Sequence, residues 1–232
     1  MNAPPLRIAS YNLQKCVGLD LRRRPERSLQ VIEDLGAQIV VLQEADKRLP
    51  PRPAALPHAL AQARGWQVVD FGEPRASLGW CGNAMLLRPG FEVLDIDAFH
   101  LPGLEPRGAI RADLHTPLGP LRVVGTHLGL IRRDRLKQLH AITSHLGRLA
   151  PLPTVLAGDF NEWGQTRTLD HVTPGLLILP SQPSFPSPRP IAPLDRFAIS
   201  PDLFAINEGT HHGSPARVAS DHLPVWLDFG VR

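Results

Sequence analysis

Residues 154–161 read TVLAGDFN, an apolar run that leads into an aspartate and, two positions later, an asparagine. An uninterrupted run such as VLAGDF is typical of a strand that is buried on both faces. The stretch IVVLQE at 39–44 has the same form and ends in a glutamate. A carboxylate at the end of a buried strand is costly unless it is paired or bound to a metal. The two stretches therefore predict a buried sheet with polar groups of chemical importance at its strand ends.

Nine further apolar runs of strand length surround these two, and proline or glycine interrupts nearly every gap. They are Leu6–Asn12, Trp66–Phe71, Asn83–Arg88, Phe91–Phe99, Gly108–His115, Leu121–Leu128, Leu194–Ser200, Phe204–Glu208 and Pro224–Phe229. Three segments have helical patterns: Pro25–Gly36, Ala54–Arg64 and Arg132–Leu149. Many strands with few helices, and no regular alternation after the first third, predict an α/β fold of two stacked sheets flanked by helices.

Length and composition limit the class of protein. A chain of 232 residues suits one large domain or at most two small ones, and we treat residues 1–232 as one domain. The 25 prolines are about twice the usual share and argue against a helical bundle. Six of them fall in Pro180–Pro193. We expect this segment to be an ordered, semi-rigid surface loop, with a domain linker as the alternative.

Charge and cysteine usage say less about function. The net charge of +3 permits an anionic ligand but does not demand one. Cys16 and Cys81 belong to no CxxC pair, so no zinc site is implied and a reducing compartment is expected. No apolar run approaches the 18 residues of a membrane span, and no signal peptide is visible. These features favour the cytoplasm, and the sequence makes no prediction of oligomeric state.

The most informative pattern is that polar residues gather at the ends of the apolar runs. Glu44 and Asp221 are hard oxygen ligands, which suit Mg²⁺ or Mn²⁺ and not zinc. Asn12 could complete or orient the metal's ligand shell. The remaining members of the set are His127, Asp159, Asn161, Asp195 and His222.

These residue types together suit hydrolysis of a phosphate ester. Asp159 and Asn161 stand two apart, so an extended chain points both to one side, where they could position a water and hold an anionic oxygen. His127 and His222 can donate to a phosphoryl oxygen. Asp195 could fix the tautomer of one histidine. A metal ion as Lewis acid would complete a hydrolytic phosphate site.

Each residue also has a purely structural interpretation. Glu44 could be an ordinary ion-pair partner, and Asp159 with Asn161 could be turn formers. Asp221 and His222 could form a turn or a helix cap. His127 could be a hydrogen-bonded core histidine, and Asp195 could pair with an arginine such as Arg196.

The chain also resembles the endonuclease/exonuclease/phosphatase superfamily, which has the deoxyribonuclease I fold. The matching stretches span nearly the whole chain in the family's order: IASYN (8–12), VLQE (41–44), GNAMLLR (82–88), GTHL (125–128), AGDFNEW (157–163), LDRFAIS (194–200) and SDHLPV (220–225). GDFN and SDH together, about 60 residues apart and before a final strand, are the specific part of the match. The likeness is greatest to short bacterial members without appended domains.

The resemblance implies a four-layer α/β sandwich with two mixed β-sheets and a site at one rim. It implies that Glu44 is the metal carboxylate, Asn12 its neighbour, and Asp221 a ligand of the first or a second metal. Asp159 would position or deprotonate the attacking water, and Asn161 and His127 would bind the phosphate. His222 would contact the phosphate while Asp195 holds its imidazole. Whether Asp159 or the Asp195–His222 pair is the base stays open.

The sequence departs from the family pattern at one position, and it offers three weaker candidates for substrate binding. Position 14 is Gln, where the DNA-repair branch has a carboxylate, which weakens the case for a second metal and for abasic-site repair. Arg107 and Arg133 are candidate substrate-binding residues: Arg107 precedes a strand, and Arg133 lies in a basic cluster at a helix start, where a bound phosphate would offset the macrodipole. Asn83, in the stretch 82–88, is the third.

The sequence therefore predicts a Mg²⁺- or Mn²⁺-dependent phosphoesterase that uses direct attack of water, with a phosphodiester favoured as the substrate. The alternatives are a phosphomonoesterase acting on a sugar, inositol or nucleotide phosphate, a DNA or RNA nuclease, and a non-catalytic binding module on the same fold. A nuclease is possible, but neither the net charge nor the 6% aromatic content indicates one.

Overall fold

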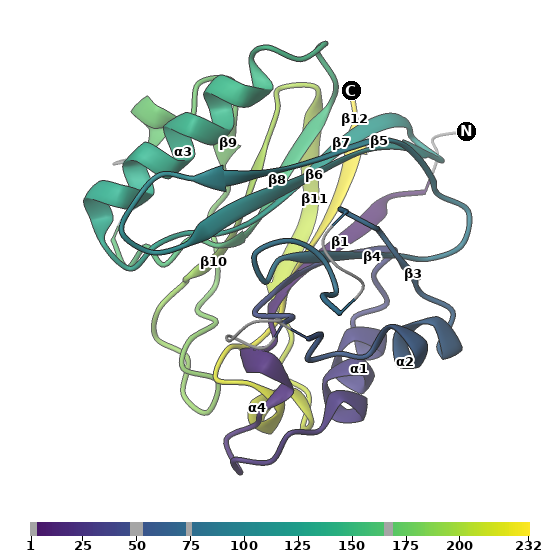
Figure 1. Cartoon of the computed structure of the whole chain (residues 1–232). Coiled ribbons are helices and arrows are strands. Elements are labelled where there is room, and N and C mark those ends of the chain that lie inside the picture. Colours follow the sequence, from purple (N-terminus) through teal and green to yellow (C-terminus); the bar gives the residue numbers. More distant parts are fainter. Residues whose placement is uncertain (1–3, 47–52, 73–75, 165–168) are drawn as a thin grey trace.

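The computed structural model describes residues 4–46, 53–72, 76–164 and 169–232. Within them the chain forms two mixed six-stranded sheets (Figure 1). The first has the order β11-β12-β1-β2-β4-β3, with β1 (Leu6–Asn12), β2 (Ile39–Gln43), β3 (Gln67–Val68), β4 (Ala84–Leu87), β11 (Leu203–Thr210) and β12 (Val225–Val231). The second has the order β5-β6-β7-β8-β10-β9, with β5 (Glu92–Leu101), β6 (Arg107–Thr116), β7 (Gly119–His127), β8 (Thr154–Asp159), β9 (Leu177–Ile178) and β10 (Asp195–Ile199).

Each sheet contains one parallel pair, and a helix connects its two strands. β1 pairs with β2 through α1 (Pro25–Asp34), and β7 pairs with β8 through α3 (Arg132–Leu146). Parallel neighbours need such a crossover because the chain must return to the same end of the sheet. The helices α1 and α3 lie on the two outer sides of the molecule, with the sheets between them (Figure 1).

Three apolar cores hold these layers together. The largest lies between the sheets and includes Ile8 and Val41 from the first and Ile110 and Val155 from the second. A second core packs α1 and α2 (His58–Ala63) against the outer face of the first sheet. A third packs α3 against the outer face of the second. The predicted four-layer α/β sandwich is therefore confirmed.

The two sheets approach closely at Gly125 of β7. A Cβ atom at this position would lie 2.7 Å from Cγ1 of Val41 on β2 and 2.9 Å from Cγ1 of Ile110 on β6. Both distances are shorter than carbon atoms in contact allow. The absence of a side chain at position 125 thus sets the spacing of the sheets near the strand ends.

Most predicted elements are present, with shorter ends. α2 covers only six residues of the predicted helix Ala54–Arg64, because Ala54 forms an isolated bridge with Asp46 and the helix begins after Pro57. α3 ends at Leu146, where Gly147 is the C-cap, and not at Leu149. The sequence reasoning missed β9 and α4 (Ala216–Ala219), and the short 3₁₀ turns Gln14–Cys16 and Asp170–Val172, because such short elements show no periodicity.

Strand polarity explains why the polar residues meet at one rim. β1, β2, β7 and β8 end there, since each parallel pair points the same way. Their antiparallel neighbours β12, β4, β6 and β10 begin there, as the register Asp195↔Asp159 shows for β10. Carboxyl ends of four strands and amino ends of four others therefore converge.

In the part of the chain that the structure describes, no helix is long and apolar enough to cross a membrane.

Candidate active site

A pocket of about 480 Å³ opens at this rim, between the ends of the two sheets. Eight of the predicted site residues line it: Asn12, Glu44, Arg107, His127, Asp159, Asn161, Asp221 and His222. Its wall also contains the apolar side chains Leu130, Trp163, Phe185 and Leu194. The pocket thus combines a polar floor with an apolar side.

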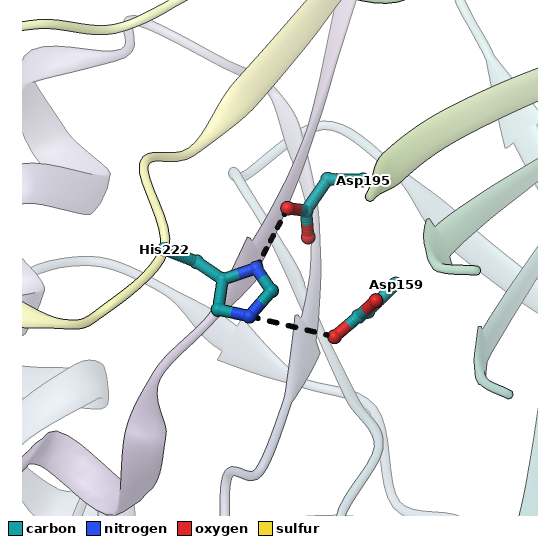
Figure 2. Close-up of side chains that lie close together, drawn as sticks. All are labelled: Asp159, Asp195 and His222. Carbon is teal, nitrogen blue, oxygen red and sulfur yellow. Dashed lines mark hydrogen bonds and ion pairs between the residues drawn. The ribbon is translucent and has the colours of Figure 1, made fainter. Parts of the chain in front are cut away.

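Asp195, His222 and Asp159 form a chain of polar contacts at the floor (Figure 2). Nδ1 of His222 lies 2.8 Å from Oδ2 of Asp195, and Nε2 of His222 lies 3.7 Å from Oδ2 of Asp159. Asp195 is fully buried, and its Oδ2 also accepts a hydrogen bond of 2.6 Å from the hydroxyl of Ser184. Asp195 therefore holds the imidazole with Nδ1 protonated and Nε2 facing the pocket.

The charges at the floor change the pKa of His222. Burial alone would lower the pKa of this imidazole, but the charge of Asp195 and its hydrogen bond, with Asp159 and Asp221 behind them, raise it well above the ordinary value. These charges favour the protonated imidazole, which can donate a hydrogen bond from Nε2 into the pocket.

Asp159 has the opposite character. Burial and then the charge of Asp195 raise the pKa of its carboxyl, although His222 and two hydrogen bonds lower it in part. Those bonds come from the backbone N–H of Asn161 (2.9 Å) and from Nδ2 of Asn12 (3.1 Å). A carboxylate with a raised pKa takes up a proton more readily than an ordinary aspartate.

Two more polar side chains lie against Asp159. Nε2 of His127 is 3.4 Å from Oδ2 of Asp159. Burial, followed by the charges of Arg107, His222 and Lys15, lowers the pKa of His127, so this histidine is neutral. Asn161 itself has a left-handed backbone (φ 51°), and its side chain donates from Nδ2 to the carbonyl of Leu128 at 2.9 Å.

Two carboxylates on the opposite side of the pocket fit a divalent cation. Burial raises the pKa of Asp221, the charge of His222 lowers it in part, and the charge of Glu44, which lines the same pocket, raises it. Carboxylate oxygens are the ligands that Mg²⁺ and Mn²⁺ prefer. Asn12 donates to Asp159 and its Oδ1 accepts from the N–H of Gln14 (3.0 Å), so it links this side of the pocket to Asp159. Asp159, Asp195 and His222 also offer ligand atoms within 4.8 Å of one another, but Nδ1 of His222 is engaged by Asp195.

The same order of motifs appears in a known family. A model described as the endonuclease/exonuclease/phosphatase family matches residues 9–222. The chain belongs to this family. Its members are hydrolases that act on phosphate esters, and they generally depend on a divalent metal. The resemblance inferred from the sequence motifs is thereby confirmed.

Similar proteins come from several bacteria. The chain is 27% identical over 164 residues to the uncharacterized protein YbhP of Escherichia coli, and the match covers 63% of this chain and 62% of YbhP. It thus spans less than two thirds of that relative. An endonuclease/exonuclease/phosphatase structure from Beutenbergia cavernae has a TM-score of 0.73 at 24% identity, covering 99% of this chain and 72% of the other. A mannosyl-6-phosphatase from Bacteroides thetaiotaomicron has a TM-score of 0.76 at 19% identity, covering 97% and 99%. The two structures share the fold of this chain.

Two predicted substrate-binding residues of this family member do not lie at the pocket. Arg133 has a side chain that is 73% exposed and lies 3.8 Å from Asp134. Arg135 points inward instead, because residues two positions apart in a helix are about 200° apart around its axis. It is buried and donates to Glu162 at 3.1 Å, so an acidic side chain, and not a phosphate, accompanies the basic helix start.

Asn83 is the second predicted substrate-binding residue that does not line the pocket, whereas Arg107 lines it as predicted. Asn83 is buried outside the pocket and donates from Nδ2 to the carbonyl of Gly108 at 3.0 Å, which joins the start of β4 to β6 of the other sheet. Arg107 lines the pocket and pairs with Glu105 at 2.7 Å.

Ten of the 18 residues that line the pocket were not among the predicted site residues, and they include Lys15, Cys81, Trp163 and Phe185. Lys15 forms an ion pair with Glu44, and Cys81 lies 3.7 Å from Nδ1 of His100. The rings of Trp163 and Phe185 meet edge to face, and Phe185 also contacts the ring of His222. Position could have indicated Lys15 and Trp163, since each stands within three residues of a predicted site residue.

Proposed function

We propose that this protein is a Mg²⁺- or Mn²⁺-dependent phosphoesterase that hydrolyses a phosphate ester by direct attack of water. The observation that carries the proposal is the position of Asp159. It lies between a protonated His222 held by Asp195 and a pair of carboxylates, Glu44 and Asp221, across one pocket. A base, cationic donors and a metal-binding pair are the parts that hydrolysis of a phosphate ester requires.

The metal, held by Glu44 and Asp221, would supply a Lewis acid for the phosphoryl oxygen and the water. Asp159 takes the proton of the attacking water, because its pKa is raised and His222 is already protonated. This assigns the base to Asp159 and leaves His222 to donate to the phosphoryl group. His127 and Asn161, which lie beside Asp159, hold the phosphoryl oxygens, and Arg107 adds a positive charge to the pocket.

A phosphodiester is the favoured substrate because of the apolar side of the pocket. Leu130, Trp163 and Phe185 line it, and Trp163 is 61% exposed, so its ring is available to pack on an organic group. A diester carries a second organic group that such a wall can receive. A phosphomonoester remains the second candidate, since one protein of the same fold is a mannosyl-6-phosphatase.

Nucleic acid is a weaker candidate partner than a small phosphate ester. Lys15 and Arg107 are the basic side chains in the pocket lining, whereas a nuclease contacts several phosphates beyond the scissile one. A non-catalytic binding module is disfavoured because Glu44, Asp159 and His222 are all present at the pocket. We further propose that the chain is one domain and that it works in a reducing compartment such as the cytoplasm, in keeping with its low cysteine content of two residues in 232.

The test measures hydrolysis of bis(p-nitrophenyl) phosphate and p-nitrophenyl phosphate with Mg²⁺, with Mn²⁺ and with EDTA. We expect metal-dependent turnover that is faster for the diester. Asp159→Asn and His222→Ala should each lower kcat by about 10²-fold or more, as loss of a base or an oxyanion donor does.

Two surface variants serve as matched controls: Asp202→Asn and His140→Ala, both at exposed positions. Both should keep the wild-type rate. Absence of metal-dependent turnover in the wild type, or equal rates in all five proteins, would exclude the proposal, whereas faster hydrolysis of the monoester would exclude only the diester preference.

A further inference from the structure

The turn after β1 has an uncommon backbone. Gln14, Lys15 and Cys16 have φ values of 45°, 59° and 57°, and none of them is glycine. Residues with a Cβ rarely adopt this left-handed region, and such conformations are concentrated at functional sites. Backbone hydrogen bonds hold the turn: Lys15 N–H donates to the carbonyl of Glu44 (3.1 Å), and Arg24 N–H donates to that of Cys16 (2.9 Å).

This turn places the side chain of Lys15 in the pocket. Its ammonium group forms an ion pair with the carboxylate of Glu44, the residue that we assign to the metal. Glu44 itself has a φ of 49°, so both partners are held by left-handed backbone. The side chains are about 30% exposed, which leaves the pair open to the pocket. The ammonium group of Lys15 is thus the positive charge that neutralises the carboxylate of Glu44 in the structure.

Lysine is an unusual choice in this protein. Only three of its 25 basic residues are lysines: Lys15, Lys47 and Lys137. Arginine would bind Glu44 with a planar, two-pronged group, whereas lysine carries a compact charge on a flexible stem. A lysine ammonium can therefore leave one oxygen partner and reach another while its backbone stays fixed.

We propose that Lys15 is a displaceable cation that neutralises Glu44 in the metal-free protein and binds the substrate's phosphate in the metal-loaded protein. The proposal rests on the metal-dependent function proposed above. The acceptor that we infer is a phosphoryl group beside His127, because Lys15 and His127 line the same pocket. Gln14 is neutral, so no carboxylate at that position competes for the ammonium.

The first test is calorimetric titration of metal-free protein with Mg²⁺. Lys15→Met should bind Mg²⁺ about fivefold more tightly than the wild type, because an ion pair of this exposure no longer competes for Glu44. Arg107→Met is the matched control: it removes one positive charge from the same pocket, but Arg107 pairs with Glu105 and not with Glu44. Equal tightening in both variants would mean a general charge effect and would overturn the proposal.

The second test follows the lysine directly. Acetylation by N-hydroxysuccinimidyl acetate, measured by peptide mass spectrometry, gives the rate at Lys15 relative to the exposed Lys137. Mg²⁺ should raise this ratio by freeing the ammonium, and added inorganic phosphate should lower it again. A ratio that Mg²⁺ leaves unchanged or lowers would overturn the proposal.

The two proposals fail in different ways. If the wild type neither binds Mg²⁺ nor shows metal-dependent turnover, the proposed function fails. If it does both while Lys15→Met keeps the wild-type affinity, only the role of Lys15 fails.

Discussion

Asp113 and Asp159 are both buried aspartates, yet their partners shift their pKa values in opposite directions. Burial alone would raise the pKa of Asp113, but hydrogen bonds from Arg122 and Arg111 outweigh it and the pKa falls below its ordinary value. Asp159 has a second carboxylate nearby and no guanidinium among the groups that shift its pKa, so its pKa rises. Burial therefore marks neither residue as catalytic, and the sign of the shift separates a structural carboxylate from a candidate base.

Asp113→Asn should lower the free energy of unfolding by about 3–5 kcal/mol, because it leaves buried guanidinium groups without their anion. Both oxygens of Asp113 accept from Arg122 at 2.8 Å, and Arg111 lies 3.0 Å away. A carboxyl with a lowered folded pKa stabilises above its unfolded pKa and loses this as pH falls through the folded pKa. Urea unfolding should therefore show a constant deficit from pH 7 to pH 5 and a smaller one below about pH 4.

Asp95→Asn is the matched control for Asp113→Asn. Asp95 accepts from the same Arg111 at 2.8 Å, but its side chain is 67% exposed. It should lower the free energy of unfolding by about 1 kcal/mol or less. Equal losses in the two variants, or a deficit for Asp113→Asn that does not change with pH, would contradict this assignment.

At the residue scale the sequence predicted the positions of eight pocket residues, because each lies at the end of an apolar run or next to one. It failed for Arg133 because a basic cluster at a helix start does not fix how the helix is rotated about its axis. It failed for Lys15 because the left-handed turn that brings this side chain into the pocket has no sequence signature, and only the nearness of Lys15 to Asn12 could have indicated it. Contacts across the chain, such as Ser184 with Asp195, could not be predicted either.

At the element scale Gly125 of β7 is a point of close contact between the two sheets, since a Cβ atom there would lie 2.7 Å from Cγ1 of Val41 on β2. Asp159 is the last residue of β8, which pairs with β7, and Glu44 is the first residue after β2. We therefore expect a side chain at position 125 to change the distance between Asp159 and Glu44, and so to alter the chemistry at the rim.

Gly125→Ala should lower the free energy of unfolding by about 1–3 kcal/mol and reduce kcat, because the added methyl group forces the sheets apart. Val41→Ala in the same chain should restore part of both losses. Urea unfolding and the diester assay, run on both single variants and the double variant, measure this coupling.

Gly147→Ala provides the comparison for Gly125→Ala. Gly147 ends α3 at a φ of −65°, where alanine is accommodated, so stability and rate should stay near the wild type. Strictly additive effects of Gly125→Ala and Val41→Ala would show that these two positions are not in contact.

The long elements were predictable because each contains at least one full period of burial. β9 has two residues and α4 has four, and both were missed. The order of strands within the sheets could not come from periodicity, since pairing such as β8 with β10 joins segments that the helical and strand patterns treat independently. The sequence analysis made no prediction of that order; the family resemblance supplied only the four-layer arrangement.

For the whole molecule, metal binding and folding should be coupled. Glu44 and Asp221 both line the pocket, and a divalent cation that binds only the folded state stabilises it. At 100 times its dissociation constant, Mg²⁺ should add about 2.7 kcal/mol, which for a chain of this length is a rise in Tm of roughly 5–10 °C.

Thermal unfolding in EDTA and in Mg²⁺ measures this rise. Glu44→Gln should abolish it, whereas Glu33→Gln on α1, where the carboxylate pairs with Arg64, should keep it. A rise in Tm that survives Glu44→Gln would place the metal elsewhere, and the absence of any rise in the wild type would argue against a metal site that depends on the fold.

The proline-rich loop, Pro180–Pro193, forms part of the pocket wall and is hydrogen-bonded to residues of the site. Ser184 holds the same oxygen of Asp195 that binds His222, and the N–H groups of Ser187 and Leu223 join the loop to the segment 221–223. Phe185, between the two serines, is part of the pocket wall. The loop therefore cannot be replaced independently of the catalytic residues. A loop graft that alters Phe185 must preserve Ser184 and Ser187, or it will change the rate of hydrolysis together with the substrate selectivity.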